Sequence, residues 1–409
     1  MPTYFARRLI PVAGPVLENA ALTVRDGRIA AIGPRHRADL PAGDAVFDLG
    51  DVVLLPGFVN AHTHLEFGGL SQPLGRPGMS FPDWVREVLA YRRTGGFDPI
   101  AAIDAGLRES ARFGVTTIGD IASTSPETLF DRAPTNVEVV AFVETLGLAE
   151  SRLPDQLVRL EAFLARADTS SVRRGISPHA PYSTRPALVE AAVALSTKLR
   201  LPTAMHLAES REELELLRSG SGPFVDFLRE LGVWDPQAIP FGATPLDYLR
   251  TLSRAQRALV VHGNYLAPNE IEFLAAHAEL MSVVYCPRTH AYFAHDRHPL
   301  PQLIAAGASV ALGTDGRCTN PDLDLLAEMR CVAASFPELR PERILQLGTL
   351  DGARALGRAD EVGSLVVGKH ADFVAVAGVD EAVDPAAAVL GESAHVVGVW
   401  KRGREVKAE

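Results

Sequence analysis

The stretch between residues 53 and 356 alternates short apolar runs with longer amphipathic segments, and this alternation restricts the fold more than any other feature. Strand-like runs occupy residues 53–60, 115–120, 137–144, 174–179, 202–207, 258–262, 280–286 and 309–315. Helix-like segments lie between them, and two more, 322–334 and 341–356, follow the last run. Strands that alternate with helices predict βαβ units and a parallel sheet, and eight of them predict a (β/α)8 TIM barrel. A doubly wound open sheet is the alternative, but no G-x-G-x-x-G follows the first run.

The two ends of the chain have a β character that the middle lacks. Asp26-Gly27 separates two alternating apolar stretches, 21–25 and 28–32, which is a hairpin pattern. Near the other end, Arg402-Gly403 lies between the strand-like residues 396–401 and 404–406. We therefore expect a small β-sandwich domain built from residues 1–55 and 357–409, beside a barrel formed by residues 56–356.

Composition narrows the class of protein. Of 409 residues, 47% are hydrophobic and 22% are charged, which is typical of a soluble globular protein. The net charge of -10 and the absence of a Lys/Arg run argue against a nucleic-acid partner. The three cysteines form no pairing pattern, which favours the cytoplasm. No apolar run is long enough to predict a membrane partner.

The first run ends in His62-Thr63-His64. Residues i and i+2 of a strand point to the same side, so these two imidazoles can reach one point, and imidazole is a ligand for Zn, Fe, Cu or Ni. Alone, the pattern is equally compatible with two hydrogen-bonded loop histidines. However, seven of the eight runs end in a potential ligand, acid or base: His62 and His64, Asp120, Glu144, His179, His206 with Glu209, His262, and Asp315. Since barrel enzymes place their chemistry at the carboxyl ends of the strands, this set predicts a metal site.

Four motifs make a family resemblance specific. They are Pro56-Gly57-Phe58-Val59-Asn60-Ala61-His62-Thr63-His64, Met205-His206-Leu207-Ala208-Glu209, Val261-His262-Gly263 and Leu312-Gly313-Thr314-Asp315. With these motifs, the chain resembles the amidohydrolase superfamily over almost its whole length. The His206-x-x-Glu209 spacing and the segment Ser177-Pro178-His179-Ala180-Pro181-Tyr182 resemble its cytosine, guanine and adenosyl-homocysteine deaminase branch.

The resemblance implies one divalent metal ion, Zn²⁺ or alternatively Fe²⁺, held by His62, His64, His206 and Asp315. Two-metal relatives use a lysine on the fourth strand, and this chain has no lysine before Lys198. The implied reaction is hydrolytic deamination, in which metal-activated water attacks a ring carbon that bears an amino group. By the same resemblance, Glu209 transfers protons, Asp315 accepts a proton from the water, and His262 orients the water. The alternative for Glu209 is a charge that stabilises a helix N-terminus.

Other residues bear on the substrate. By resemblance, His179 contacts a ribose. Arg288, with Arg92 or Arg93 as second choices, is expected to bind a carboxylate through paired hydrogen bonds. Glu66 and Glu144 are further candidate substrate contacts.

Some segments depart from the adenosyl-homocysteine pattern, including Cys286-Pro287-Arg288-Thr289-His290, where that group has C-P-x-S-N. These departures resemble the aminodeoxyfutalosine deaminases of menaquinone biosynthesis. The expected substrate is therefore a small nucleoside, 6-amino-6-deoxyfutalosine, converted to futalosine and ammonia.

Several alternatives stay open from the sequence. The substrate could instead be adenosine, adenosyl-homocysteine, methylthioadenosine, cytosine or guanine, and a triazine dechlorinase or cyclic-amide hydrolase is a more distant enzyme reading. A non-catalytic scaffold is another possibility, which the complete ligand set argues against. The histidines of the loop after the seventh run, His290, His295 and His298, form either a lid or a solvated loop, and a homodimer is left open.

Overall fold

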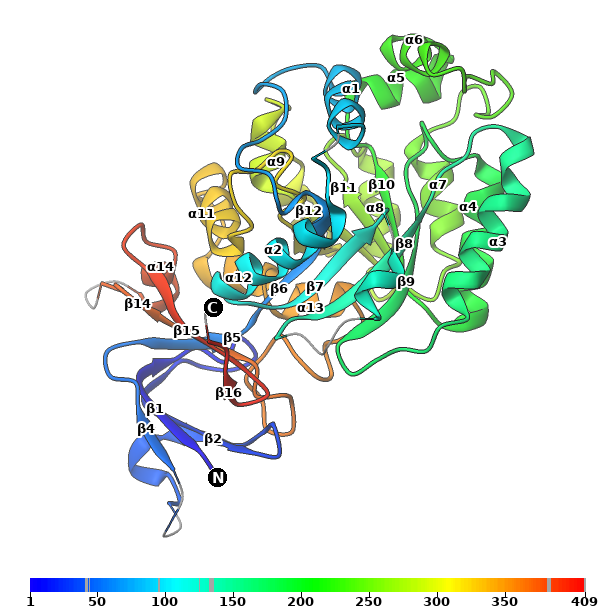
Figure 1. Cartoon of the computed structure of the whole chain (residues 1–409). Coiled ribbons are helices and arrows are strands. Elements are labelled where there is room, and N and C mark those ends of the chain that lie inside the picture. Colours follow the sequence, from blue (N-terminus) through cyan, green and yellow to red (C-terminus); the bar gives the residue numbers. More distant parts are fainter. Residues whose placement is uncertain are drawn as a thin grey trace.

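The computed structural model describes residues 1–40, 43, 45–94, 96–124, 126–131, 136–380 and 384–407. It contains a barrel of parallel strands and a separate mixed sheet, which lies at one end of the barrel (Figure 1). No helix in this described part of the chain has the length and apolarity of a membrane span.

Eight parallel strands pair in sequence order and form the barrel. They are β6 (Phe58–Thr63), β7 (Val115–Ala122), β8 (Glu138–Thr145), β9 (Val172–Pro178), β10 (Thr203–Leu207), β11 (Ala258–His262), β12 (Met281–Tyr285) and β13 (Ser309–Leu312). The last strand returns to the first, where Thr63 bridges Asp315 and the His64 amide donates to the Asp315 carbonyl at 2.9 Å. The predicted TIM-like barrel is confirmed.

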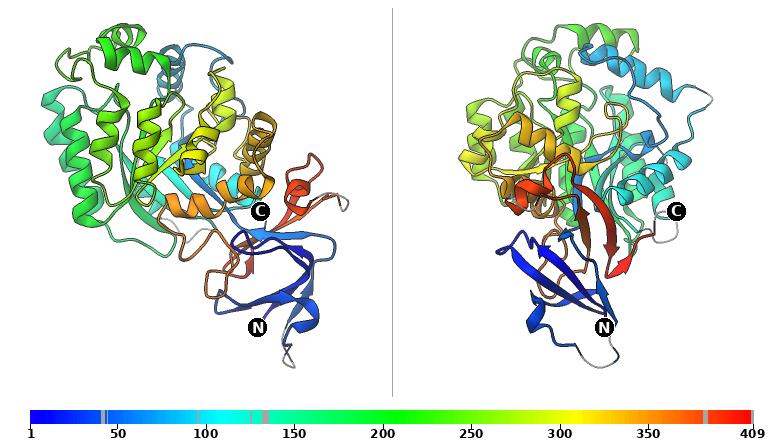
Figure 2. Two further views of the ribbon diagram at one scale, coloured as in Figure 1. Left: turned by 180° about the vertical axis from the view of Figure 1, so that it is seen from behind. Right: turned by 90° about the vertical axis from the view of Figure 1, so that its left-hand side faces the viewer.

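Helices cover the outside of the barrel and its carboxyl-terminal rim (Figure 2). Those that alternate with the strands are α2 (Pro99–Arg112), α3 (Leu153–Leu164), α4 (Pro186–Leu199), α5 (Arg211–Ser219), α6 (Pro223–Glu230), α7 (Pro245–Leu252), α8 (Pro268–Ala276), α9 (Pro287–Tyr292), α10 (Leu300–Ala306), α11 (Leu325–Ser335), α12 (Pro341–Leu347) and α13 (Leu350–Ala355). The rim also carries α1 (Phe81–Arg92), and α14 (Pro385–Val389) lies near the small sheet. Short 3-10 turns are η1 (Arg35–Arg37), η2 (Leu65–Phe67), η3 (Pro126–Leu129) and η4 (Glu150–Arg152).

The small sheet combines both ends of the chain, as predicted. Its order is β16-β15-β14-β5-β1-β2-β3, with β4 paired to β1. The strands are β1 (Thr3–Leu9), β2 (Leu17–Arg25), β3 (Arg28–Pro34), β4 (Val46–Asp48), β5 (Val53–Pro56), β14 (Phe373–Ala377), β15 (His395–Lys401) and β16 (Arg404–Glu405). The residue pairs Asp26-Gly27 and Arg402-Gly403 have positive φ angles (50° and 75°, 49° and 70°), which close the two expected hairpins.

The prediction of one strand over residues 53–60 was wrong, because the run divides at Gly57. Residues before it form β5 in the small sheet, and residues after it form β6 in the barrel. The Gly57 amide donates to the Asp372 carbonyl at 2.9 Å. A Cβ at this position would lie 2.4 Å from the Thr116 side chain, so only glycine fits where the chain passes from one sheet to the other. The domain boundaries themselves, at 55/56 and 356/357, stay a prediction.

Candidate active site and metal centre

A cavity of about 490 Å³ opens at the carboxyl ends of the barrel strands. Its floor is polar and consists of His64, Arg92, Glu144, His179, His206, Glu209, His262 and Asp315. The period of two along a strand explains part of this floor. In β8, Val140 and Phe142 pack inside the barrel, and Glu144 follows on the same side at the strand's end. In β10, Ala204 and His206 have the same relation. The inward-facing side chains of these strands are thus apolar inside the barrel and polar at its carboxyl-terminal end.

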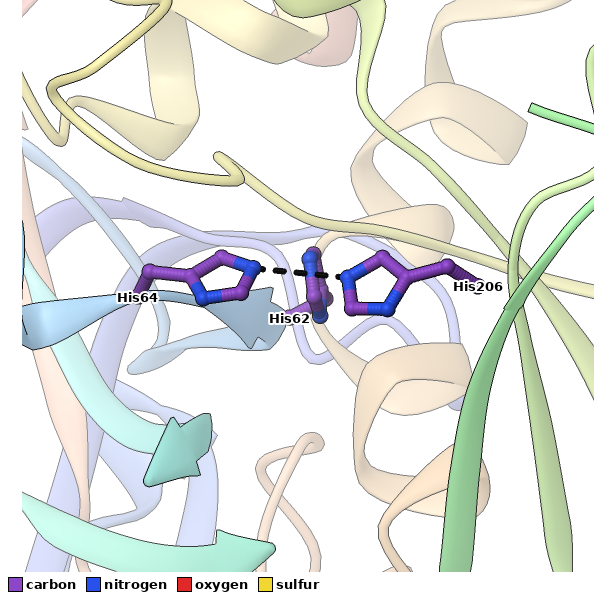
Figure 3. A group of neighbouring side chains, drawn as sticks. All are labelled: His62, His64 and His206. Atoms are coloured by element: carbon purple, nitrogen blue, oxygen red, sulfur yellow. Dashed lines mark hydrogen bonds between the residues drawn. The ribbon is translucent and has the colours of Figure 1, made fainter. Parts of the chain in front are cut away.

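Three histidines from β6, the residue after it, and β10 converge at this floor (Figure 3). His62, His64 and His206 each offer one ring nitrogen, and these nitrogens all lie within 4.8 Å of one another. The Nε2 atoms of His64 and His206 are 3.3 Å apart. Burial lowers the pKa of His64 and His206, so both rings are neutral at physiological pH. Neutral, converging imidazoles are the form in which histidine binds a metal.

Asp315 completes this group from the loop after β13. Its Oδ1 lies 3.3 Å from the Nε2 of His62 and 3.5 Å from that of His64. Burial alone would raise the pKa of Asp315, but the hydrogen bond with His62 and the neighbouring imidazoles lower it below its usual range, so the side chain is a carboxylate. The four predicted metal ligands are therefore together, and His262 could also join His62 and Asp315 around an ion.

Backbone strain concentrates at this floor. Ala208, His262 and Asp315 have φ angles of 54°, 69° and 56°, although none of them is glycine. Such a conformation costs about 1–3 kcal/mol per residue and persists only where the surroundings hold it. All three follow or end a barrel strand, where the left-handed turn redirects the chain so that neighbouring side chains enter the cavity.

Glu209 and His262 form a pair beside the predicted metal ligands. Glu209 Oε1 lies 3.1 Å from His262 Nε2, and both side chains are buried. Burial, with the nearby charges of Asp315 and Glu213, raises the pKa of Glu209 well above its usual range. Burial lowers the pKa of His262 to about 3. The pair thus joins a carboxyl group whose protonated form is favoured by burial to a neutral imidazole, an arrangement suited to proton transfer.

The other predicted substrate contacts divide into two groups. Glu66, Arg92, Glu144 and His179 lie at or next to the floor. Arg92 donates to the buried carboxylate of Glu66, and His179 Nε2 lies 3.7 Å from Glu144 Oε1. His179 Nδ1 is 2.5 Å from Ser183 Oγ, which fixes the ring. Arg92, Glu144 and His179 line the same cavity and could contact one bound molecule, whereas Glu66 is not part of the lining and is held against Arg92.

Arg288 is not brought to this cavity, contrary to the sequence-based expectation. Its guanidinium donates to Glu328 at 2.7 Å and to Asp322 at 2.8 Å. Glu328 is fully buried, and a buried carboxylate requires a paired cation. Arg288 therefore neutralises a carboxylate within the fold, and an anionic substrate group would have to displace that partner.

The apolar wall of the cavity was missed from the sequence. Helix α1 contributes Phe81, Trp84, Val85, Val88 and Leu89, and α6 with the residues after it contributes Phe227, Leu228, Leu231 and Val233. A serine at the N-cap, Ser80, could have revealed the start of α1 from the sequence. In the structure its side chain accepts from the Asp83 amide. The two helices are joined by Arg86, which donates to Glu230 at 2.7 Å. At the edge of the wall, Arg152 and Gln156 add polar groups.

The histidines of the loop after β12 are neither solvated nor part of the cavity lining. His290 and His298 are buried, and His295 is half-buried. His298 Nε2 is 3.0 Å from the His262 carbonyl, and its ring stacks on Tyr285 with 3.9 Å between the centroids. These contacts hold the strained backbone of His262 in place.

Comparisons with known proteins agree with this geometry. Two similar proteins are named 5-methylthioadenosine/S-adenosylhomocysteine deaminase. The one from Moorella thermoacetica is 29% identical to this chain over 387 residues, which cover 90% of this chain and 83% of that protein. The one from Desulforudis audaxviator is 30% identical over 393 residues, which cover 90% of this chain and 82% of that protein. The solved structure of Helicobacter pylori aminofutalosine deaminase in complex with methylthio-coformycin covers 100% of both chains with a TM-score of 0.86 and 24% identity. That of a Xanthomonas campestris adenosine deaminase with bound zinc covers 99% of this chain and 92% of the other, with a TM-score of 0.80 and 24% identity. At this identity, the two structures establish the shared fold.

The family model described as the amidohydrolase family matches residues 53–406. This match spans most of the chain and includes every residue of the cavity floor. The chain therefore belongs to the amidohydrolase family and is a hydrolase that acts on C–N bonds.

Proposed function

We propose that the protein is a metal-dependent deaminase of an adenine nucleoside with an extended substituent, and that its substrate is 6-amino-6-deoxyfutalosine, converted to futalosine and ammonia in menaquinone biosynthesis. The observation that carries the proposal is the pair of Glu209 and His262 beside four converging ligand residues, at the base of a cavity with apolar walls. The names of the relatives, deaminases of methylthioadenosine and adenosylhomocysteine, support an adenine nucleoside.

The residues present fit a single divalent metal ion. His62, His64 and His206 place neutral nitrogens within 4.8 Å of one another, and Asp315 adds a carboxylate that is ionised. We assign these four side chains as the ligands. A bound Zn²⁺ or Fe²⁺ would supply a water nucleophile at neutral pH, because a coordinated water has a pKa of about 7.

Glu209 and Asp315 move the protons of the reaction. Hydrolysis of an amino group replaces it with oxygen, so one water proton must reach the ring nitrogen and the other must reach the departing amine. Glu209, whose raised pKa favours the protonated form, gives a proton to the ring nitrogen, while Asp315 accepts a proton from the water. Once the water oxygen has bonded to the ring carbon, Glu209 takes the second water proton from that oxygen and delivers it to the amine, which leaves as ammonia when the C–N bond breaks. The proton held by Asp315 then passes to Glu209, which restores both side chains. His262 orients the water through its contact with Glu209.

The walls support a nucleoside with a long substituent. Beyond the polar floor, where Glu144 and His179 are available for a ribose, the cavity continues between apolar side chains. Phe81 and Trp84 stack at 5.6 Å between ring centroids, and flat aromatic walls suit an aromatic substituent. Arg152 at the outer edge offers a cation for a carboxylate there. A substrate that joins adenine, ribose and an aromatic acid would contact each of these parts.

The test is ammonia release by the metal-loaded protein from a panel of 6-amino-6-deoxyfutalosine, methylthioadenosine, adenosylhomocysteine, adenosine and cytosine. We expect the highest kcat/KM for 6-amino-6-deoxyfutalosine. Higher values for methylthioadenosine or adenosylhomocysteine would contradict the assigned substrate but retain the reaction. No release from any adenine nucleoside would contradict the proposed function.

A further inference from the structure

The segment that presents Glu209 to the cavity has a strained backbone. Ala208, which precedes it, has a φ angle of 54°. Burial does not explain how this conformation is held, because the side chain of Ala208 is only a methyl group. The segment makes hydrogen bonds from both sides instead, and one side is supplied by a carboxylate that lines no part of the cavity.

That carboxylate is Glu213, the third residue of α5, and it is fully buried. Its Oε1 accepts from the Ala208 amide at 2.9 Å, and its Oε2 accepts from the Glu209 amide at 2.9 Å. Ser210 caps the same helix and accepts from the Glu213 amide at 3.2 Å. A glutamate at this helical position ordinarily reaches only the amide of the capping residue. Glu213 also binds the amides of the two residues before the cap.

Asn264 holds the same segment from the opposite side. Its Nδ2 donates to the Glu209 carbonyl at 2.9 Å, and it is buried. The Tyr265 amide donates to the Ala208 carbonyl at 3.1 Å. Both the amide and the carbonyl of Glu209 are therefore bound by side chains outside the cavity. This arrangement fixes the position from which the Glu209 carboxyl reaches His262 Nε2.

We propose that Glu213 is a positioning residue for the proton-transferring Glu209, and that Asn264 is the second half of the same clamp. The proposal rests on the proposed role of Glu209. By binding the Ala208 and Glu209 amides together, the two oxygens of Glu213 hold the left-handed turn and aim the Glu209 carboxyl at the bound substrate.

The chain contains a matched control for this role. Glu270 is the third residue of α8, is buried, and also binds two amides: its Oε2 accepts from Ala267 at 2.7 Å and its Oε1 from Leu246 at 3.2 Å. Neither Glu270 nor its partners line the cavity. Replacement of Glu270 by glutamine removes the same kind of hydrogen bond from the fold without touching Glu209.

The first measurement compares crystal structures of the wild-type protein, Glu213→Gln and Glu270→Gln. The Ala208 and Glu209 amides bind different oxygens of Glu213, and glutamine has an NH2 group in place of one of them, so one of the two amides would face a donor instead of an acceptor. We expect the distance between Glu209 and His262 Nε2 to lengthen beyond hydrogen-bonding range in Glu213→Gln and to stay near 3.1 Å in Glu270→Gln. An unchanged Glu209 in Glu213→Gln would overturn the proposal. This result does not depend on which substrate the enzyme uses, so it separates failure of this proposal from failure of the proposed function.

The second measurement is steady-state kinetics with metal content and melting temperature. We expect Glu213→Gln to lower kcat about 10- to 100-fold with KM changed less than about threefold and the metal content intact, since misplacement of a catalytic group acts mainly on the chemical step. Glu270→Gln should melt at a similar temperature and keep its kcat. Equal losses of kcat in both variants would overturn the proposal. If Glu213→Gln does not fold, Asn264→Ala provides the same test. We expect a similar loss of kcat in this variant, and an unchanged kcat would overturn the proposal.

Discussion

The floor and the wall of the cavity are built in different ways. The floor consists of polar side chains, most of them at strand ends, and buried groups hold the segments that carry them. The His179 carbonyl lies 3.0 Å from His206 Nδ1, Glu213 accepts from the Glu209 amide, and Asp120 accepts from the amide of Leu65, next to His64, at 2.8 Å. The wall consists of apolar side chains on two short helices, joined at the surface by the partly exposed pair of Arg86 and Glu230. We infer that the floor determines the reaction, whereas the wall determines which molecule reaches it.

Removal of the metal ion tests the floor and should have the largest effect. Dialysis against a chelator should lower kcat on the order of a thousandfold or more, because a metal ion contributes several kcal/mol to the activation of water and tenfold in rate corresponds to about 1.4 kcal/mol. The melting temperature should also fall, since bound metal stabilises the folded state. Activity and metal content measured after addition of Zn²⁺ or Fe²⁺ should recover together. Full activity in metal-free protein would contradict the assignment.

Replacement of Trp84 by alanine tests the wall. Loss of an aromatic contact with the substituent should raise KM by about 10- to 100-fold, equivalent to about 1–3 kcal/mol, and leave kcat nearly unchanged. Adenosine, which lacks an extended substituent, should show a much smaller change. Phe241→Ala is the control, because Phe241 is 83% exposed and lies outside this cavity. A kcat that falls while KM stays constant would show that Trp84 acts on the chemical step, and it would contradict the distinction between wall and floor.

The pH dependence of stability tests the buried, uncharged state of His298, whose ring contacts the backbone of His262 next to the floor. Burial lowers the pKa of His298 to about 3, against the opposing hydrogen bond with His262. The unfolded chain therefore binds more protons than the folded chain between pH 3 and the ordinary histidine pKa of about 6.5. This contribution to stability is complete above about pH 6.5 and is lost as the pH falls, by up to about 1.4 kcal/mol per pH unit.

Denaturant unfolding from pH 7 to pH 5 measures this loss. His298→Gln should flatten the decline of the unfolding free energy, whereas His36→Gln should not, because His36 is exposed. Parallel curves for the wild-type protein and His298→Gln would contradict the buried, uncharged state of His298.

The same contrast explains what could be predicted from the sequence. The floor follows from local rules: alternation along β8 and β10 puts Glu144 and His206 on the inner side, and the succession of eight runs puts all strand ends at one rim. The two hairpins also follow from local turn chemistry. The prediction that Arg288 lines the cavity was wrong because its ion-pair partners, Asp322 and Glu328, are 34 and 40 residues away in the sequence. No local pattern indicates that Arg288 pairs with them.

The wall was missed for a related reason. The apolar residues of α1, such as Phe81 and Val88, line the cavity and also pack in the hydrophobic core. A sequence does not distinguish an apolar side chain that only packs in a core from one that also lines a binding cavity. Glu213 is a similar case. As the third residue of a helix capped by serine, it fits an ordinary capping pattern, and its contact with the Glu209 amide depends on the strained turn at Ala208.

The most direct test of the account is ammonia release by Glu209→Gln, with metal content measured on the same samples. Glutamine retains the size of the side chain and cannot transfer a proton, and general acid–base catalysis contributes about 10²- to 10⁴-fold. We predict a loss of kcat in this range with one equivalent of metal still bound, whereas Glu212→Gln, outside the cavity, should retain wild-type activity. Wild-type kcat in metal-loaded Glu209→Gln would contradict the assignment of this side chain as the group that transfers the proton.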